Sequence, residues 1–286
     1  MSTYHITIIG GDLRQCYMAD YLQQSSHIVT CFNTMPFSYK SDIKTANSLK
    51  QALSDAEIVI GPVPFSKDKE TIYSLATGAG APLLKDFFEL LRQDQVLAGG
   101  MIPTHISQLC GYKSIRVVDF MLSESLMLHN AYLTAEGLLS KLISETDFSL
   151  KDQNILILGY GNCGFTIGEV LKSMFANVFV FEQNEKRIAL AKTRQLKTAG
   201  LFDLSALLPD FSLIINTIPA HILTEKQLTS LHHDCLIFDI ASAPGGFSKE
   251  VMDTMEPKLF SCPGIPGKFM PKTAGKLIGD TILQSI

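Results

Sequence analysis

Short apolar runs alternate with longer amphipathic stretches along the whole chain. Apolar runs of about four to eight residues are typical of strands that are buried on both faces of a parallel sheet. In the first half, this pattern predicts strands over 4–9, 27–32, 57–60, 95–99 and 114–118, and helices over 12–22, 46–53, 83–91 and 103–111. Such alternation predicts parallel strands that are joined by crossover helices.

The second half repeats this alternation from Asn154 onward. It predicts strands over 154–158, 178–182, 212–216 and 235–240, and helices over 165–174, 185–194, 224–230 and 273–286. A mostly apolar stretch over 121–145 separates the halves and is expected to be helical. The pattern therefore predicts an α/β protein of two doubly wound Rossmann-like domains with an interdomain cleft, because ligands bind beyond the carboxyl ends of such strands.

Residues 158–164, with the sequence LGYGNCG, lie where the first strand of the second half passes into a helix. Gly159 would permit the tight turn, Gly161 would let a pyrophosphate approach the backbone, and Gly164 would let the helix pack close to the strand. Glu182 follows the next strand, about 20 residues further on, where a ribose-binding acid belongs. The spacing predicts a nicotinamide-dinucleotide site, and the alternative is a glycine turn that only packs a strand against a helix.

The predicted cofactor-binding residues lie in this turn, after the second strand, and in the loops after the later strands. They are Gly159, Tyr160, Gly161, Asn162, Cys163, Gly164, Glu182, Asn216, Thr217, Pro219, Asp239, Ala241, Pro263 and Gly264. Some alternatives stay open. The loop at Asn216 could be an ordinary strand end, Asp239 could orient a ligand or tie down its loop, and Cys163 could be an activated thiol at a helix N-terminus or simply pack there.

The corresponding turn of the first half, Gly10-Gly11-Asp12-Leu13-Arg14-Gln15, lacks the G-x-G-x-x-G spacing. The first half is therefore expected to hold substrate rather than a dinucleotide. We assign 1–120 to an N-terminal Rossmann-like substrate domain, 121–150 to an interdomain helical segment, 151–270 to an NAD(P)-binding Rossmann domain, and 271–286 to a C-terminal helix that returns to the domain interface.

Polar residues near these turns are the candidates for substrate binding and catalysis. The predicted substrate-binding residues are Asp12, Arg14, Gln15, Thr134 and Lys272, since Arg binds carboxylates in a bidentate manner and Lys supplies a positive charge. The catalytic candidates are Lys272, Glu136 and His129. The alternatives are solvated charges for Arg14, Lys272 and Glu136, and a structural histidine for His129.

Composition narrows the class of protein. The 286 residues are 46% hydrophobic, carry a net charge of −4 and contain no basic run, so nucleic acid is not expected as a partner. No stretch reaches about 18 consecutive apolar residues, so we expect no membrane span. The six cysteines form no C-x-x-C pair, so neither disulfides nor a metal site is expected. These features predict a soluble cytoplasmic protein and leave homo-oligomerisation open.

Several motifs occur in one order along nearly the whole chain. They are IGGDLRQ at 9–15, TAEG at 134–137, INTIPA at 215–220, DIASAPGG at 239–246, PGIPG at 263–267 and PKTAG at 271–275. With these motifs the chain resembles the A subunit of bacterial dipicolinate synthase, a sporulation enzyme. The resemblance is weakest over 34–119.

The resemblance implies that a dihydrodipicolinate-type intermediate of the lysine pathway is oxidised to pyridine-2,6-dicarboxylate, with a nicotinamide cofactor as hydride acceptor. It also implies a flavoprotein-like B subunit as partner. The family is expected to carry arginines, suited to a 2′-phosphate, after the second strand and in the glycine turn. Here Glu182-Gln183 and Asn162 stand at those positions, which favours NAD over NADP.

Two other functions compete with this interpretation. The first is another two-domain NAD(P)-dependent dehydrogenase, acting on a hydroxy or amino acid, which would need a His–carboxylate pair that the sequence does not reveal. The second is a regulatory protein that binds NAD(P) without catalysis.

Overall fold

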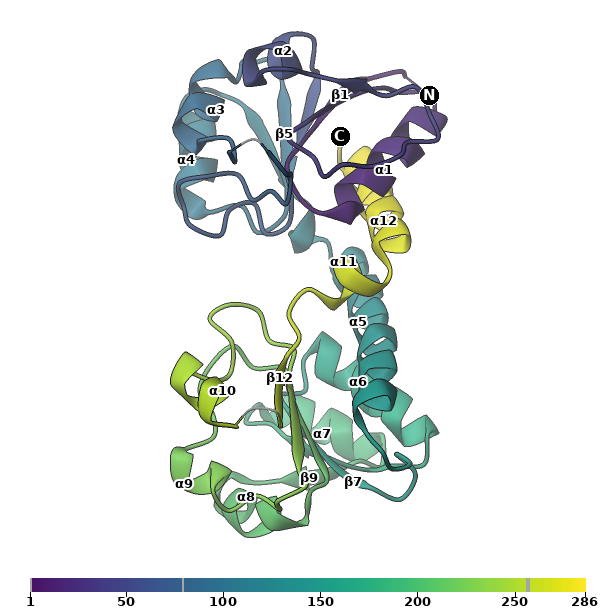
Figure 1. The fold of residues 1–286 in the computed structure, drawn as a ribbon, viewed down its shortest axis with the longest axis vertical. Helices are drawn as coiled ribbons and strands as arrows, with labels where there is room; N and C mark the ends of the chain where they lie inside the picture. The colour runs from purple at the N-terminus through teal and green to yellow at the C-terminus, as the bar shows by residue number, and fades with distance from the viewer. Residues whose placement is uncertain (1, 79, 256–257) are drawn as a thin grey trace. The chain divides into compact units, whose positions relative to one another are not determined.

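The computed structural model of the protein describes residues 2–78, 80–255 and 258–286 (Figure 1). The chain forms two compact units. Unit 1 comprises Met1–His129 and Gly267–Ile286, and unit 2 comprises Asn130–Pro266. Each unit contains one parallel six-stranded sheet with flanking helices, so the predicted α/β architecture of two Rossmann-like domains is confirmed. No helix in the described part of the chain is long and apolar enough to cross a membrane.

Unit 1 has the strand order β3-β2-β1-β4-β5-β6, which is the order of a doubly wound dinucleotide-binding sheet. Its strands are β1 His5–Ile9, β2 Ile28–Phe32, β3 Lys44–Thr45, β4 Ile58–Ile60, β5 Val96–Gly99 and β6 Arg116–Asp119. Its helices are α1 Leu13–Gln24, α2 Leu49–Ser54, α3 Leu84–Leu90, α4 Thr104–Tyr112 and α12 Pro271–Ser285, with a 3-10 turn at Phe120–Leu122.

Unit 2 repeats this order in its own sheet, β9-β8-β7-β10-β11-β12. Its strands are β7 Asn154–Leu158, β8 Asn177–Phe181, β9 Lys197–Ala199, β10 Leu213–Asn216, β11 Leu236–Asp239 and β12 Leu259–Ser261. Its helices are α6 Asn162–Ser173, α7 Glu185–Thr193, α8 Leu201–Leu207, α9 Glu225–Leu228 and α10 Lys249–Met255, with a 3-10 turn at Leu208–Asp210. Helices α5 Glu124–Glu145 and α11 Ile265–Phe269 each begin in one unit and end in the other.

The central strands form because apolar residues of both parities are buried. In β1, Ile6 and Ile8 join one hydrophobic core, while Ile9 joins a second core on the other face of the sheet. In β7, Ile155 and Ile157 likewise face one core of unit 2, and neighbouring residues face another. Each fully buried side chain of this size contributes about 1.5–3 kcal/mol of transfer free energy. Burial on both faces therefore fixes the register of the two sheets.

Helix α12 packs against α1 within unit 1, as the yellow and purple helices of Figure 1 show. The contact depends on small residues, because a Cβ atom on Gly275 would lie only 2.4 Å from the backbone oxygen of Arg14. Ile278 and Ile282 of α12 are buried in the core that α1 also lines. The last helix is thus an integral layer of the first Rossmann-like unit.

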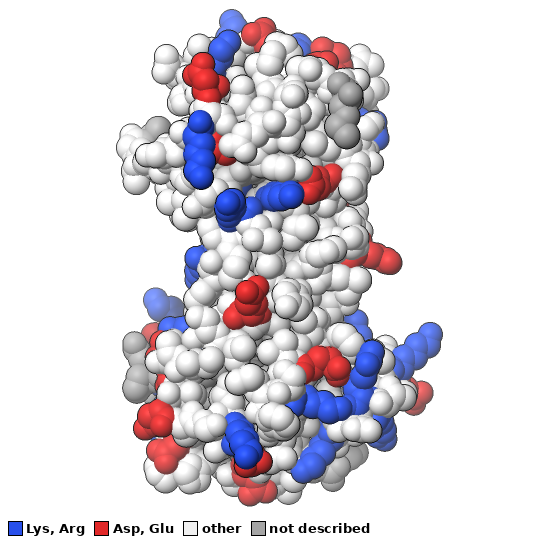
Figure 2. Space-filling view, turned by 90° about the vertical axis from the view of Figure 1, so that its right-hand side faces the viewer, with Lys and Arg blue, Asp and Glu red and all other residues white. Residues whose placement is uncertain are grey.

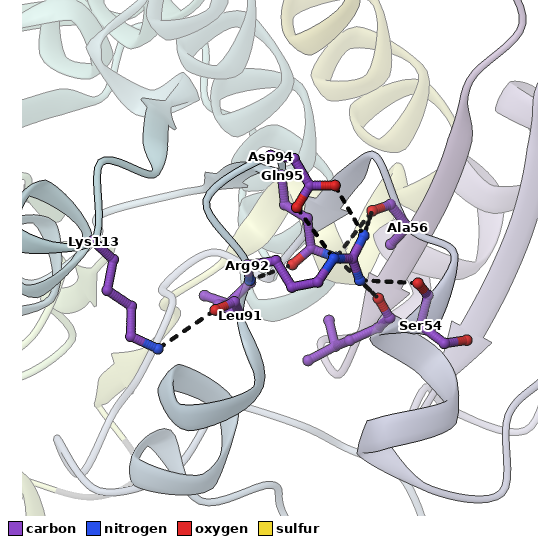
Figure 3. Close-up of polar contacts among 8 residues, drawn as sticks. Ser54, Ala56, Leu91, Arg92, Asp94, Gln95 and Lys113 are labelled. Carbon is purple, nitrogen blue, oxygen red and sulfur yellow. Dashed lines mark hydrogen bonds and ion pairs between the residues drawn. The ribbon is translucent and has the colours of Figure 1, made fainter.

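Arg92 holds the amino edge of the unit 1 sheet together (Figure 3). Its guanidinium donates to the backbone oxygens of Leu53 and Ser54 at 2.6 and 2.9 Å, and to Ala56 at 3.2 Å. The buried Gln95 also donates to Leu53 and Ala56, each at 2.9 Å. These donors satisfy carbonyl groups at the C-terminal end of α2 and just after it, which have no partner within the helix. The network is structural and lies at the edge opposite the carboxyl ends of the strands.

Candidate nucleotide-binding site

Two glycines of the predicted turn are required by the fold itself. Gly159 follows β7 with a φ of +90°, and a Cβ atom there would lie 2.5 Å from Thr217 Oγ1. A Cβ atom on Gly164 would lie 2.1 Å from the backbone oxygen of Gly159. Any side chain at either position would therefore displace backbone or packed side-chain atoms. These two residues shape the turn and let α6 approach β7 closely.

Gly161 differs because its missing side chain leaves open space. It is the N-cap of α6 with an ordinary φ of −77°, and no side chain caps the helix. A Cβ atom there would meet only the guanidinium of Arg187, at 3.8 Å or more. The first N–H groups of α6 lack partners within the helix, and the helix dipole is positive at this end. The turn thus offers an open anion-binding surface of the kind that dinucleotide phosphates use.

A pocket of about 340 Å³ lies beside this turn, within unit 2. Its lining combines glycine backbone, apolar side chains and one ion pair; the residues are Gly159, Gly161, Phe181, Glu182, Gln183, Arg187, Thr217, Ile218, Pro219 and Ile222. The volume lies at the small end of the range of about 300–1,000 Å³ for ligand sites. A groove of similar size between α3 and α4 of unit 1 involves neither glycine turn.

Glu182 is held at the mouth of the turn by backbone donors. Its Oε2 accepts from Tyr160 N at 2.9 Å, and its Oε1 accepts from Gln183 N and Asn184 N at 2.8 and 3.0 Å. Burial alone would raise its pKa, but these three N–H groups and the Arg187 guanidinium outweigh that effect and lower it. Glu182 is therefore anionic near neutral pH, with one acceptor direction on Oε2 still available for a ribose hydroxyl.

Asn216 and Asp239 bind each other, which decides between the two predicted roles of Asp239. Asn216 Nδ2 donates to Asp239 Oδ1 at 2.8 Å, and both side chains are buried. Asp239 also accepts from Ala241 N at 3.2 Å and from Gly246 N at 2.9 Å. The carboxylate thus ties down the loop after β11, and it does not line the pocket.

The other predicted cofactor residues divide in the same way. Thr217 and Pro219 line the pocket, and Thr217 Oγ1 donates to Leu158 O at 2.9 Å. Asn162 and Pro263 are exposed, and Gly264 has a φ of +70° in the loop after β12. Neither Pro263 nor Gly264 is part of the pocket lining. Contact of these last residues with a cofactor stays a prediction.

Tyr160 and Cys163 are packing residues of the turn. The Tyr160 ring is buried against Phe165, and burial raises the pKa of its phenol to about 12. Burial also raises the pKa of the Cys163 thiol, although a hydrogen bond to Thr134 partly opposes this. The idea of an activated thiol at the helix N-terminus is therefore wrong, since burial outweighs the helix dipole here. Thr134 itself is buried and donates to Asn130 O at 2.7 Å.

The corresponding turn of unit 1 is covered by its own chain. Gly10 and Gly11 both have positive φ values, of 65° and 83°. Gly11 N donates to Tyr73 O at 2.8 Å, and Leu75 N donates to Gly11 O at 2.9 Å. A Cβ atom on Gly10 would lie 2.5 Å from Tyr73 O. The loop between β4 and α3 thus lies directly on this turn and pairs with its backbone groups.

Arg14 is already paired within unit 1. Its Nε and Nη2 donate to the two carboxylate oxygens of Asp12 at 2.9 and 2.7 Å, and Nη2 also donates to Val63 O at 2.8 Å. Gln15 completes a capping box with Asp12 at the start of α1. A Cβ atom on Gly267 would lie 2.9 Å from Arg14 Nε, so the PGIPG motif packs on the pair. A substrate carboxylate would have to share the Arg14 guanidinium with Asp12.

The three catalytic candidates are all exposed side chains. Lys272 lies in the first turn of α12, and Glu136 lies on α5. His129, also on α5, has its Nδ1 2.8 Å from the backbone oxygen of Ser125. The contacts of the described residues do not bring any two of them together, so their catalytic roles stay predictions.

Four lining residues were not predicted from the sequence: Phe181, Arg187, Ile218 and Ile222. Arg187 carries a usable signal, because it lies one helical turn after the ribose acid, at the start of the following helix. The three apolar residues carry none, since their side chains are indistinguishable in sequence from those of the core.

Comparison with known proteins agrees with this geometry. Residues 5–121 match the family model of the N-terminal domain of the dipicolinate synthase A subunit, including the stretch over 34–119 where the motifs gave least support. The dipicolinate synthase A subunit of Bacillus subtilis (strain 168) is 25% identical over 279 residues, which cover 97% of this chain and 94% of the relative.

Solved structures show the same fold. The dipicolinate synthase A subunit from Bacillus halodurans has a TM-score of 0.86 at 23% identity and covers 100% of this chain and 98% of its own. The corresponding structure from Bacillus subtilis has a TM-score of 0.84, also at 23% identity, over 100% and 97%. A more distant structure, an L-alanine dehydrogenase, has a TM-score of 0.60 at 16% identity, over 97% and 88%. The chain is thus similar over nearly its whole length to the A subunit of dipicolinate synthase, and the resemblance predicted from its motifs is confirmed.

Proposed function

We propose that this chain is the nicotinamide-binding catalytic subunit of a dipicolinate synthase. It would oxidise a dihydrodipicolinate-type intermediate of the lysine pathway to dipicolinate. The observation that carries the proposal is the open turn at Gly161 beside the anchored carboxylate of Glu182. The similarity to the dipicolinate synthase A subunit and the fold shared with a dehydrogenase support it.

The residues present fit a dinucleotide. The α6 N-terminus and Gly161 would bind the diphosphate, Glu182 would accept hydrogen bonds from the ribose diol, and Thr217 and Pro219 would border the bound ligand. A bound nicotinamide supplies the hydride acceptor of the reaction. NAD is the preferred form, because an anionic Glu182 would repel a 2′-phosphate while it accepts from a free hydroxyl.

Unit 1 would supply the main substrate-binding groups. The substrate is a small flat dianion, so it needs cations, and Arg14 and Lys272 are the proposed ones, with Asp12, Gln15 and Thr134 as further contacts. Asp12 would hold the Arg14 guanidinium in one orientation. Loss of one hydride and one proton makes the ring aromatic, so the protein mainly has to position the ring and accept the proton. Lys272, Glu136 and His129 are the candidates for the proton acceptor.

The proposed setting is the cytoplasm, with a flavoprotein-like B subunit as partner. This part rests on the name of the relative, which is one subunit of a synthase. Charges of both signs occur on each unit over the face drawn in Figure 2, without a large patch of one sign. Co-expression followed by co-purification of the two chains tests the partnership.

The activity is tested by supplying the product of the lysine-pathway condensation enzyme, generated in the same vessel, together with NAD. We expect NADH and dipicolinate to form in equal amounts, and Glu182→Gln to slow the reaction with NAD more than with NADP. Parallel reactions with the B subunit separate a need for the partner from a lack of activity. Absence of dipicolinate under all of these conditions would contradict the proposal.

A further inference from the structure

Arg187 lies between the two halves of the proposed nucleotide site. It belongs to the first turn of α7 and lines the pocket. Its Nη1 lies 3.6 Å from Glu182 Oε2 and would be 3.8 Å from a Cβ atom on Gly161. The guanidinium is therefore next to both the phosphate-binding turn and the ribose-binding carboxylate.

The contact between Arg187 and Glu182 is loose. A separation of 3.6 Å is beyond hydrogen-bond range, and the Arg187 side chain is 53% exposed. Exposed pairs of this kind are weak, so moving the guanidinium away from Glu182 costs little. Arg14 shows the contrast, since its side chain is only 10% exposed and makes two short hydrogen bonds to Asp12. Arg187 is free to change partner, whereas Arg14 is fixed.

The pocket also needs a cation. Among its lining residues in the described chain, Arg187 is the one cation and Glu182 the one anion. The α6 N-terminus offers only partial positive charge, equivalent to about half an elementary charge. A dinucleotide diphosphate carries two negative charges and would enter close to the Glu182 carboxylate. The turn alone therefore leaves this negative charge uncompensated.

We propose that Arg187 is the side-chain counterion of the cofactor diphosphate, and that nucleotide binding moves its guanidinium from Glu182 to a phosphate oxygen. The inference rests on the proposed function. It also explains how Glu182 becomes available, because Oε1 already accepts two backbone N–H groups while Oε2 accepts only one. Departure of Arg187 leaves Oε2 open to a ribose hydroxyl, so one movement completes both halves of the site.

The test is calorimetric titration of the full chain with ADP-ribose, which carries the diphosphate, and with adenosine, which lacks it. We expect Arg187→Gln to weaken ADP-ribose binding by about tenfold, as for loss of one charge-assisted hydrogen bond, and adenosine binding by less than about twofold. Arg187→Lys should recover part of the loss, because it keeps the charge. The matched control is Arg194→Gln at the other end of α7. Arg194 is 51% exposed and 4.0 Å from Glu169, and it does not line the pocket.

Different failures are distinguishable. Equal loss for ADP-ribose and adenosine would overturn the inference by placing Arg187 on the nucleoside. A loss confined to 2′-phospho-ADP-ribose would overturn it in favour of a 2′-phosphate contact. Unchanged binding by both Arg187 variants would overturn it outright while leaving the proposed function standing. If the wild-type chain binds neither ADP-ribose nor NADH, the proposed function itself fails.

Discussion

The two glycine turns of this protein have the same place in the fold and opposite surroundings. Both follow the first strand of a sheet with the same strand order, and both lead into a helix. In unit 2, the space beside Gly161 is open and borders a pocket. In unit 1, the backbone of Tyr73 and Leu75 pairs with Gly11 and occupies the equivalent position.

The difference teaches that a Rossmann-like sheet offers a place for a ligand without determining what fills it. A glycine can be needed because a ligand approaches it, as at Gly161, or because the chain itself approaches, as at Gly10. Substitution separates these cases, since the first should cost binding and the second should cost stability.

The largest expected effect is on binding, at Gly161. We expect Gly161→Thr to weaken NADH binding at least about 100-fold, or about 2.7 kcal/mol, because the side chain would occupy the diphosphate position. The free energy of unfolding should change little, since threonine is a favourable N-cap residue and the φ of −77° suits it. Fluorescence titration and urea unfolding measure the two quantities. Normal affinity in this variant would mean that the open turn is not the phosphate site.

The reverse outcome is expected at Gly10. Gly10→Ala should lower the free energy of unfolding by about 2 kcal/mol, because of the φ of +65° and the collision with Tyr73 O. The NADH affinity of the folded protein should stay as in wild type. Urea unfolding followed by circular dichroism, with titration of the folded fraction, checks both. A loss of affinity without a loss of stability would indicate a ligand site at the unit 1 turn.

A smaller effect is expected at Glu182. We expect Glu182→Gln to weaken NADH binding by about tenfold and NADPH binding much less, because the charge that discriminates against a 2′-phosphate is removed. The lowered pKa of Glu182 keeps the wild-type site ionised, so its affinity for NADH should not fall until the pH drops below the usual glutamate range, about 4.3. An unchanged ratio of the two affinities would contradict the assigned role.

The smallest effect distinguishes the amino edges of the two sheets. Buried His27 accepts from Tyr4 N in unit 1, and burial lowers its pKa, whereas Asn177 at the start of β8 in unit 2 does not titrate. The unfolded state therefore binds more protons, and β1 and β2 should lose stability as the pH falls below about 6.5, until His27 protonates in the fold as well. Hydrogen exchange of peptides from β1 and β7 measures this, and His27→Gln should abolish the pH dependence. Equal acid sensitivity of both peptides would contradict the assignment.

The sequence was most informative where burial is two-sided. The central strands of both sheets were predicted because their apolar residues form continuous runs, whereas the edge strands β3, β9 and β12 were missed. These strands have only two or three residues and include exposed positions such as Lys44 and Lys197, so no apolar pattern marks them. Helix α2 begins later than predicted because Ser48 caps it.

The candidate site was predictable only in part. The spacing of glycines and the position of Glu182 follow from local chain geometry, and they predicted the turn beside the pocket. The covering of Gly11 by Tyr73 and Leu75 is a contact between backbone atoms far apart in sequence, so no side-chain pattern encodes it. The pairing of Arg14 with Asp12 also depends on rotamers that sequence does not fix.

The central claim is that the open turn of unit 2 binds a nicotinamide dinucleotide as part of a dipicolinate-forming site. The most direct test is titration of the purified protein with NADH and with NADPH, followed by nicotinamide fluorescence, in the presence and absence of dipicolinate. We predict that NADH binds more tightly than NADPH and that dipicolinate changes the affinity for NADH. Tighter binding of NADPH would contradict the role of Glu182, and binding of neither nucleotide would contradict the central claim.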